Sequence, residues 1–249
     1  VCLRFLKTDA ASRWILRTLQ LYLKQYLLRY CPAKGRIHHL RNVRQHLRVL
    51  SFQSSADGAS RWLRHRSGAH EYHSPTLQAV QCEGGSDLFD VDYFGKKGVF
   101  LAQTWQLYAE PAVFALEKIY TIAPSFRAEK SKTSRHLTEY WHAEMEMAWS
   151  NFDDIIGHGE ALLKHVVAAV LAKHNKELEI LGRDPAKLQP TVDKPFVRMT
   201  YTEALKILKE KCDMEIEWGK DLRTIEEDKL SKLYDVPIIC THYPKKVKA

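Results

Sequence analysis

Alternation of polar and apolar residues over 139–149 predicts a strand with one polar and one apolar face. The polar face carries His142, Glu144 and Glu146, and the apolar face carries Trp141, Ala143, Met145 and Met147. Successive side chains of a strand point to opposite faces, so a period of two over this length favours a strand over a helix. Two apolar runs, 98–103 and 118–126, predict further strands, with a helix near 106–117 between them.

Apolar residues at helical spacing predict two long helices. The first covers 12–30 and ends before Pro32. The second begins at a cap formed by Asp153 or Asp154 and ends by Gly182. A proline-containing linker over 185–195 follows it.

A shorter helix is predicted over 202–211, with Thr202 as its cap, and Thr200 with Glu203 has the spacing of a capping box. Residues 236–243 predict one more strand. The predicted strands follow one another along the chain with helices between some of them, and strands and helices do not alternate as in βαβ units. This order predicts the α+β class, with an antiparallel sheet flanked by helices.

The net charge of +8 is distributed unevenly along the chain. Residues 1–70 hold eleven Arg and three Lys against two Asp, a net charge of +12, so residues 71–249 carry −4. A basic segment beside a nearly neutral domain permits contact with nucleic acid or with an acidic surface. The basic, apolar helix over 12–30 would suit a membrane surface or its own domain, and packing on the domain is favoured.

Cysteine usage and hydropathy predict a cytoplasmic protein without a membrane partner. The five cysteines form no Cys-x-x-Cys pair, which argues against a disulfide framework or a cysteine-based zinc site. No stretch approaches about 18 consecutive apolar residues, so no transmembrane helix is predicted. Charged residues interrupt any apolar core of a secretory signal near the start.

Several common catalytic motifs are absent from the sequence. It contains no G-x-x-x-x-G-K-[ST], no G-x-G-x-x-G and no G-x-S-x-G. P-loop, dinucleotide-binding and hydrolase functions therefore lack support. H-E-x-x-H is also absent and the twelve histidines are scattered, so no metal ligands are predicted.

The stretch 120–147 combines a predicted hairpin with many cations and carboxylates. Arg127 follows the first strand, and Lys130, Lys132, Arg135 and His136 lie in the loop. A planar guanidinium on a rigid strand can hold phosphate or carboxylate through two parallel hydrogen bonds. The loop cations could neutralise a polyphosphate, and Tyr140 could stack on a base. Glu144 and Glu146 are either part of this site or satisfied carboxylates of the sheet.

The string FRAEKSKTSRHLTEY, followed by E-x-E, resembles motif 2 of the class II aminoacyl-tRNA synthetases. Within that family it is most similar to the aspartyl and asparaginyl enzymes of archaeal and eukaryotic type. EYHSPTL resembles the end of motif 1, and CEGGSDLFDVDYFG resembles the loop that closes over the amino acid. LAQTWQLYAE resembles the amino-acid-recognition segment, and RMTYTEALKILKE resembles the sequence after the inserted helices. The resemblance is collinear over about 70–248.

The resemblance implies a nucleotide-binding role for five residues. Arg127 would hold the ATP α-phosphate and the substrate carboxylate, and Glu129 would meet the adenine or the tRNA terminus. Arg135 and His136 would contact the outer phosphates, and Tyr140 would stack on adenine.

The resemblance also implies which residues bind the amino acid. Glu83, Gln103 and Gln106 would contact it, with Glu83 suited to its ammonium. In aspartyl enzymes the position of Ala109 is typically Lys, which pairs with the substrate carboxylate, so that counter-charge is missing here. Glu110, as in asparaginyl enzymes, can accept a hydrogen bond from a carboxamide and would repel a second carboxylate. Asparagine is therefore favoured over aspartate.

These roles imply an ATP-dependent ligase without a nucleophilic side chain. The amino-acid carboxylate would attack the α-phosphorus of ATP, giving an adenylate and pyrophosphate, and the tRNA terminal hydroxyl would then take the aminoacyl group. Arg127 and Mg²⁺ would supply positioning and charge stabilisation. The resemblance further implies a cytoplasmic homodimer that binds ATP, asparagine and tRNA.

The chain departs from the family at two places. Motif 3, with its glycine-rich strand and helix, is absent, so we expect a catalytic domain over 67–249 that is incomplete at its C-terminus. Residues 1–66 form a basic segment of unclear fold, which a shifted reading frame or a divergent or fused extension would explain. An aspartate ligase and a non-catalytic, synthetase-like RNA-binding module are the alternatives to an asparagine ligase.

Overall fold

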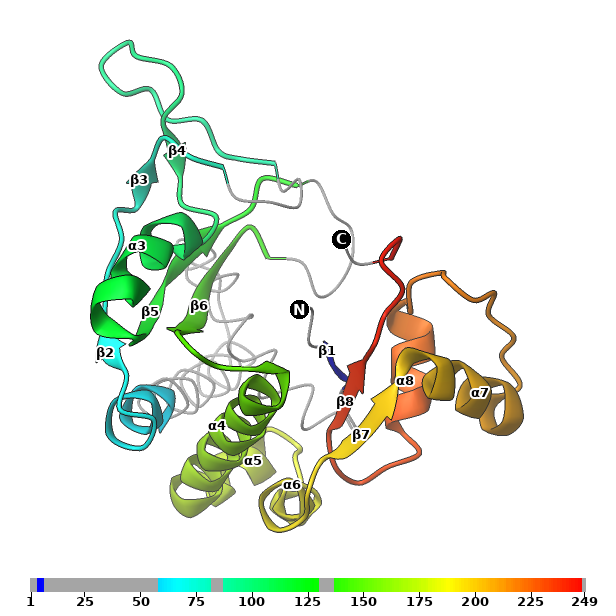
Figure 1. Cartoon of the computed structure of the whole chain (residues 1–249). Coiled ribbons are helices and arrows are strands. Elements are labelled where there is room, and N and C mark those ends of the chain that lie inside the picture. Colours follow the sequence, from blue (N-terminus) through cyan, green and yellow to red (C-terminus); the bar gives the residue numbers. More distant parts are fainter. Residues whose placement is uncertain (1–3, 7–57, 82–86, 130–136, 248–249) are drawn as a thin grey trace, which may run out of the picture. The chain divides into compact units, whose positions relative to one another are not determined.

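The computed structural model describes residues 4–6, 58–81, 87–129 and 137–247. The chain divides into two compact units, each built around its own sheet (Figure 1). Unit 1 comprises Val1–Leu16 and Asn151–Ala249, and unit 2 comprises Arg17–Ser150.

Unit 2 is built on a three-stranded sheet whose central strand is β5 (Lys118–Phe126). β5 pairs antiparallel with β6 (Glu139–Met147) along their whole lengths, and it pairs parallel with the short strand β2 (His70–Glu71). A separate antiparallel pair joins β3 (Leu77–Gln78) to β4 (Phe100–Leu101).

Helices cover both faces of the β5–β6 hairpin. Helix α3 (Gln106–Leu116) lies over the hairpin in Figure 1, and Trp105 and Ala109 form a buried cluster with Ile119 of β5. Helical residues 58–65 contact the other face, where Ser60 Oγ lies 3.2 Å from the Tyr120 hydroxyl. Because side chains alternate along a strand, the face of Ile119 also carries Glu144 and Glu146 of β6. The polar face of β6 therefore lies toward α3.

Unit 1 contains a second three-stranded sheet, in the order β1 (Arg4–Leu6), β8 (Ile238–Thr241) and β7 (Val197–Thr200). Helices α7 (Tyr201–Cys212) and α8 (Thr224–Ser231) connect β7 to β8 and form a buried cluster with Ile238 and Cys240. Helix α4 (Phe152–Lys173) packs through Ile156 onto Phe196 and Ile239. Alternation along β8 places α4 and the α7–α8 pair on opposite faces of this sheet.

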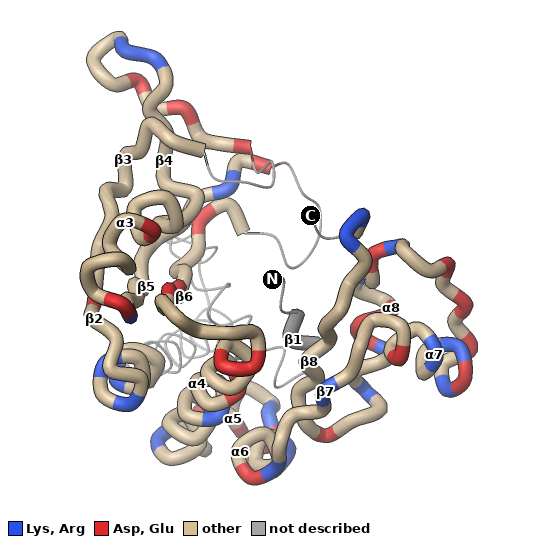
Figure 2. Tube along the Cα trace, in the orientation of Figure 1, with Lys and Arg blue, Asp and Glu red and all other residues tan. Residues whose placement is uncertain are grey.

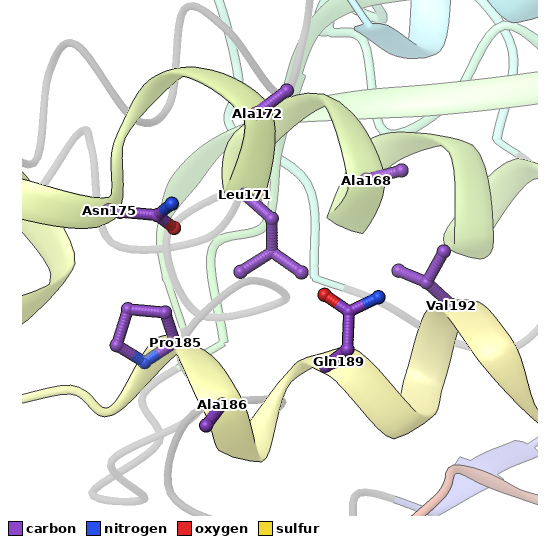
Figure 3. Close-up of a pocket in the computed structure, with 8 residues that line it drawn as sticks. All are labelled: Ala168, Leu171, Ala172, Asn175, Pro185, Ala186, Gln189 and Val192. Carbon is purple, nitrogen blue, oxygen red and sulfur yellow. The ribbon is translucent and has the colours of Figure 1, made fainter.

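Three short helices follow α4: α5 (Asn175–Ile180), the 3₁₀ helix η1 (Pro185–Lys187) and α6 (Gln189–Asp193). A groove of about 700 Å³ lies between α4 and the η1–α6 segment (Figure 3). Its lining consists of Ala168, Leu171, Ala172, Asn175, Pro185, Ala186, Gln189 and Val192. None of these side chains titrates, so the groove supplies neither an acid nor a base.

The main elements predicted from the sequence are confirmed. β5 coincides with 118–126, and α3 and β6 lie within their predicted ranges. The predicted capping box is present, since the Glu203 N–H donates to Thr200 Oγ1 at 3.2 Å and the Thr200 N–H donates to Glu203 Oε2 at 2.7 Å. The α+β class is also confirmed. The predicted helix over 12–30 lies outside the described residues.

Several boundaries predicted from the sequence are wrong. Asn151, not Asp153 or Asp154, caps α4, because its side chain accepts the Asp154 N–H while Asp154 accepts the Asn151 N–H. The long helix ends at Lys173 rather than near Gly182, and α5 follows it. Thr200 rather than Thr202 caps α7.

Two predictions about larger segments are also wrong. The linker expected over 185–195 contains η1 and α6, because proline is well placed in the first turn of a helix. The strand expected over 98–103 is reduced to Phe100–Leu101. The two three-stranded sheets also contain parallel pairs, β2 with β5 in one and β7 with β8, joined by the α7–α8 crossover, in the other.

Within the described part of the chain, α4 alone has the length and composition of a membrane-spanning helix. The sequence had predicted no such helix. A core helix of a domain in water meets the same two criteria, and α4 packs on Phe196 and Ile239 while Glu160 pairs with Lys164 at 2.9 Å. This feature alone assigns no membrane to the protein, and the absence of a membrane partner stays a prediction.

Replacing Asn151 tests the cap of α4. Asn151→Ala removes the acceptor for the Asp154 N–H, so we expect the free energy of unfolding to fall by about 1 kcal/mol. Asn151→Ser keeps a capping oxygen and should remain close to the original. Urea unfolding followed by circular dichroism measures both variants, and equal stabilities for Ala and Ser would contradict the cap.

Candidate active site

Arg127 lies at the rim of the β5–β6 hairpin. Its N–H donates to the Thr138 carbonyl at 2.8 Å, and the preceding Phe126 N–H donates to the Ala102 carbonyl at 2.9 Å. These bonds hold the end of β5 between the start of β6 and the segment that leads into α3. Arg127 Nε is buried and has no hydrogen-bond partner among the described residues. Because buried donors are normally paired, this atom is suited to an anionic ligand.

The Tyr140 ring accompanies Arg127 on the same hairpin. The guanidinium carbon lies 5.5 Å from the ring centroid, within the range of a cation–π contact. The Tyr140 ring also lies beside the His142 ring, with ring centroids 5.3 Å apart. Burial raises the pKa of the Tyr140 hydroxyl, which therefore stays protonated at neutral pH.

Burial changes the charge on the polar face of β6, whose acidic positions are marked in Figure 2. Burial, assisted by the charge of Arg127, lowers the pKa of His142 to about 4, so the ring is neutral at pH 7. Burial raises the pKa of Glu144 to about 7 although two hydrogen bonds act in the opposite direction. Burial and the charge of Glu110 raise the pKa of Glu146.

The segment before α3 brings amide side chains next to this rim. Gln103 is buried, and its Oε1 has no hydrogen-bond partner among the described residues. Gln106 begins α3 and donates through Nε2 to Glu110 Oε1 at 3.4 Å. Ala109 is fully buried against the sheet, whereas Glu110 is exposed. A guanidinium, amides and a carboxylate in adjacent segments suit a ligand that carries both an anionic group and N–H donors.

The remaining predicted site residues are less well defined. Glu129 is half-buried, two residues beyond Arg127. Glu83, Arg135 and His136 lie outside the described residues, so their roles stay predictions.

Thr104 is a residue of this site that the sequence did not single out. Its hydroxyl donates to Glu144 Oε1, from a position 40 residues earlier in the chain. The only signal in the sequence is its place between Gln103 and Gln106, which identifies no partner.

Comparison with known proteins places the chain in a family. The family model for tRNA synthetases of class II (D, K and N) matches residues 30–249. Curated relatives include the asparagine–tRNA ligase of Thermoplasma acidophilum, 40% identical over 202 residues, which are 81% of this chain and 45% of that protein. The asparagine–tRNA ligase of Pyrococcus abyssi is 44% identical over 191 residues, which are 77% and 43% of the two chains. The chain spans a little under half the length of these relatives.

Solved structures agree with this assignment. Asparaginyl-tRNA synthetase from Pyrococcus horikoshii, complexed with asparaginyl-adenylate, matches with a TM-score of 0.76 and 38% identity, covering 87% of this chain and 50% of that one. The Entamoeba histolytica asparaginyl-tRNA synthetase, also with asparaginyl-adenylate, matches with a TM-score of 0.66 and 29% identity over 85% and 46%. The match to the family model covers residues 30–249, which is most of the chain. This chain therefore belongs to the class II tRNA synthetases of the D, K and N group.

Proposed function

We propose that this chain is part of an asparagine–tRNA ligase, which activates asparagine with ATP and transfers it to tRNA. The observation that carries the proposal is the Arg127 guanidinium, with a buried and unpartnered Nε, beside the Tyr140 ring. Support for asparagine as the substrate comes from relatives named asparagine–tRNA ligases and from a neighbour complexed with asparaginyl-adenylate. The proposal concerns the whole protein that contains this chain.

In the proposed first step the asparagine carboxylate attacks the α-phosphorus of ATP and pyrophosphate leaves. Both reacting groups are anionic, so bringing them together requires a positive charge between them. Arg127 can donate to the carboxylate and the α-phosphate together, and its donors would bind more strongly as charge develops on the phosphorus. His142 is neutral and Tyr140 is protonated, so among these three side chains Arg127 alone supplies the charge.

The second step transfers the aminoacyl group. A terminal hydroxyl of tRNA attacks the carbonyl carbon of the adenylate, an ester forms, AMP leaves with the former anhydride oxygen, and the hydroxyl proton passes to the leaving phosphate or to water. Glu129, two residues from Arg127, is the described carboxylate that we assign to the adenine or the tRNA terminus. Tyr140 would stack on adenine, and Arg135 and His136 would contact the outer phosphates.

Selection of asparagine would depend on the segment that begins at Gln103. The buried Gln103 Oε1 lacks a partner among the described residues, and Gln106 and Glu110 are already joined at 3.4 Å. A carboxylate at Glu110 can accept a hydrogen bond from the asparagine carboxamide and repels the carboxylate of aspartate. Glu83 would meet the ammonium of the substrate.

Mg²⁺, a homodimeric assembly and a cytoplasmic location complete the proposal, as the family resemblance implies. Among residues 4–6, 58–81, 87–129 and 137–247, no group of three or more His, Cys, Asp or Glu side chains is arranged to hold a metal ion. We therefore assign Mg²⁺ neither a ligand nor a step here. We also retain a catalytic domain over 67–249 preceded by the basic segment 1–66, although residues 58–65 contact β5.

Arg127→Ala in the complete protein tests the proposed catalytic role. We expect asparagine-dependent ATP–pyrophosphate exchange to slow about 100-fold or more, because the lost contact strengthens in the transition state. Arg127→Lys should recover little of the rate, since an ammonium cannot form two parallel hydrogen bonds. Exchange by Arg127→Ala within a few-fold of the original protein would refute this role and those of Glu129 and Tyr140.

Glu110→Gln tests the choice between asparagine and aspartate. Removing the charge while keeping the shape should lower the preference for asparagine over aspartate in pyrophosphate exchange by about tenfold. Glu117→Gln, an exposed carboxylate just beyond α3, serves as the matched control and should leave the preference unchanged. Exchange with aspartate but not asparagine by the original protein would exclude an asparagine ligase.

A further inference from the structure

A cavity of about 460 Å³ lies in unit 1, between the segment that follows α7 and the first turn of α8. Cavities of this size are typical of sites for small molecules. The acidic and basic positions of this segment are marked in Figure 2. The lining contains four carboxylates, two cations and one apolar side chain: Glu215, Ile216, Glu217, Lys220, Asp221, Arg223 and Glu226. None of them has a role in the proposed reaction.

Glu226 is the buried member of this lining, with 1% of its surface exposed. Two donors of one guanidinium converge on a single oxygen, because Arg223 Nε and Nη2 lie 3.0 and 2.6 Å from Glu226 Oε1. Glu226 Oε2 is buried and has no hydrogen-bond partner among the described residues. In a two-pronged pair of guanidinium and carboxylate each oxygen receives one donor, so the arrangement here leaves one oxygen unsatisfied.

The unsatisfied oxygen belongs to a charged group. Burial acts to raise the pKa of Glu226, but hydrogen bonds, above all from Arg223, and the charge of Arg223 outweigh it, so the pKa lies below its ordinary value. Glu226 is therefore ionised at neutral pH, and Oε2 can only accept a hydrogen bond. A buried, ionised acceptor without a donor is unfavourable, so this oxygen is suited to a ligand that brings an N–H donor and a positive charge.

The other three carboxylates, Glu215, Glu217 and Asp221, are exposed and form the rim of the cavity. Two of these rim carboxylates have lysine partners, since Lys220 Nζ lies 2.8 Å from Glu217 Oε2 and Lys209 of α7 pairs with Glu215. Ion pairs in water contribute little to stability. The rim carboxylates can therefore exchange these partners for another cation at small cost.

The wall of the cavity is held in place by the core of unit 1. The Tyr201 hydroxyl, on a fully buried residue, donates to the Lys220 carbonyl at 2.6 Å and accepts the Gly219 N–H at 3.0 Å. Leu222, between two lining residues, is buried in the same hydrophobic cluster as Tyr201. A site that is formed in advance loses little conformational entropy when a ligand binds.

The lining favours an organic ammonium over a metal ion. Within the part of the chain that the structure describes, no three His, Cys, Asp or Glu side chains are arranged to hold a metal ion. Carboxylates lie both at the buried base of the cavity and at its rim, so a ligand with several ammonium groups can meet more than one of them. Ile216 also lines the cavity and offers an apolar contact for the methylene groups between those ammoniums.

We propose that this cavity binds a linear polyamine, with one ammonium donating to Glu226 Oε2 and another lying among the rim carboxylates. The proposal goes beyond the proposed function, because it adds a small-molecule site that the two steps of the ligase reaction do not use. It can be tested by binding alone.

Isothermal titration of the complete protein, freed of tRNA, with spermidine provides the first test. Glu226→Gln should raise the Kd about tenfold or more, because the amide removes the charge and replaces one acceptor oxygen by a donor. Glu210→Gln, an exposed carboxylate of α7 outside the lining, is the matched control and should stay within about twofold. Equal losses in the two variants would mean a diffuse effect of net charge and would overturn the site.

Arg223→Gln distinguishes a cation site from an anion site. The Arg223 side chain is 77% exposed and pairs with Glu226, so its removal takes a competing positive charge away from the carboxylate. Spermidine should then bind at least as tightly as it binds to the original protein. Weaker spermidine binding by this variant would overturn the proposal. Binding of inorganic phosphate by the original protein that Arg223→Gln abolishes would likewise mean an anion site instead.

A ligand series tests the chemical class at constant ionic strength. Propylamine should bind about tenfold more weakly than spermidine, because it has one ammonium, and a neutral diol of the same length should not bind. Displacement of spermidine by Mg²⁺ would mean a metal site. Binding of Nα-acetyl-lysine amide as tight as that of spermidine would mean a site for a lysine side chain. Either result would overturn the polyamine assignment.

Asp221→Asn serves as a second variant where Glu226→Gln does not fold, which circular dichroism reports. Asp221 is exposed, and its loss should raise the spermidine Kd about threefold. An unchanged Kd in Asp221→Asn, or a folded original protein that does not bind spermidine at millimolar concentration, would overturn the site whatever its ligase activity. A protein that binds spermidine but shows no asparagine-dependent pyrophosphate exchange would contradict the proposed function and leave the site supported.

Discussion

The pairing of β5 with β6 is the constraint on which the candidate site depends. The two strands are in register from Lys118 opposite Met147 to Phe126 opposite Glu139. A shift of one residue would move Tyr140, His142 and Glu144 to the other face of the sheet, away from α3. Arg127 follows directly on Phe126, so the same register also sets the position of the guanidinium relative to the Tyr140 ring.

Burial is the second determinant of the site, because it decides which groups are charged. The polar face of β6 has a histidine and two glutamates in sequence, yet the histidine is neutral at pH 7 and both carboxyl pKa values are raised. Each charge removed from this face reduces competition with Arg127 for an anionic ligand. The hairpin thus keeps the positive charge of Arg127 at its rim, while burial disfavours ionisation of the carboxyl groups along β6.

Local patterns predicted this hairpin well, but they predicted poorly which segments far apart in the sequence lie together. The run 118–126 and the alternation over 139–149 are signals within one strand, and both strands are present. Helix α8 was not predicted, because Thr224–Ser231 is mostly polar and lacks an apolar stripe.

Contacts between distant segments leave no local signal. The parallel pairing of β7 with β8 depends on a crossover of about 35 residues, which no local hydrophobic period indicates. The bond from Thr104 to Glu144 likewise joins positions that only the fold brings together. The resemblance to motif 2 indicated Arg127 and Tyr140, while Glu83, Arg135 and His136 depend on that resemblance alone.

The buried methyl group of Ala109 has a consequence for how substrate choice can change in this family. Ala109 of α3 has no exposed surface and packs with Trp105 and with Ile119 of β5. A lysine introduced there would add three methylene groups and an ammonium beyond the beta carbon to a closed interface. An evolutionary route from asparagine to aspartate through this position would therefore pass through a poorly folded intermediate, unless its packing partners changed first. The effect of a specificity mutation at Ala109 would therefore depend on which residues pack around it, which is a case of epistasis.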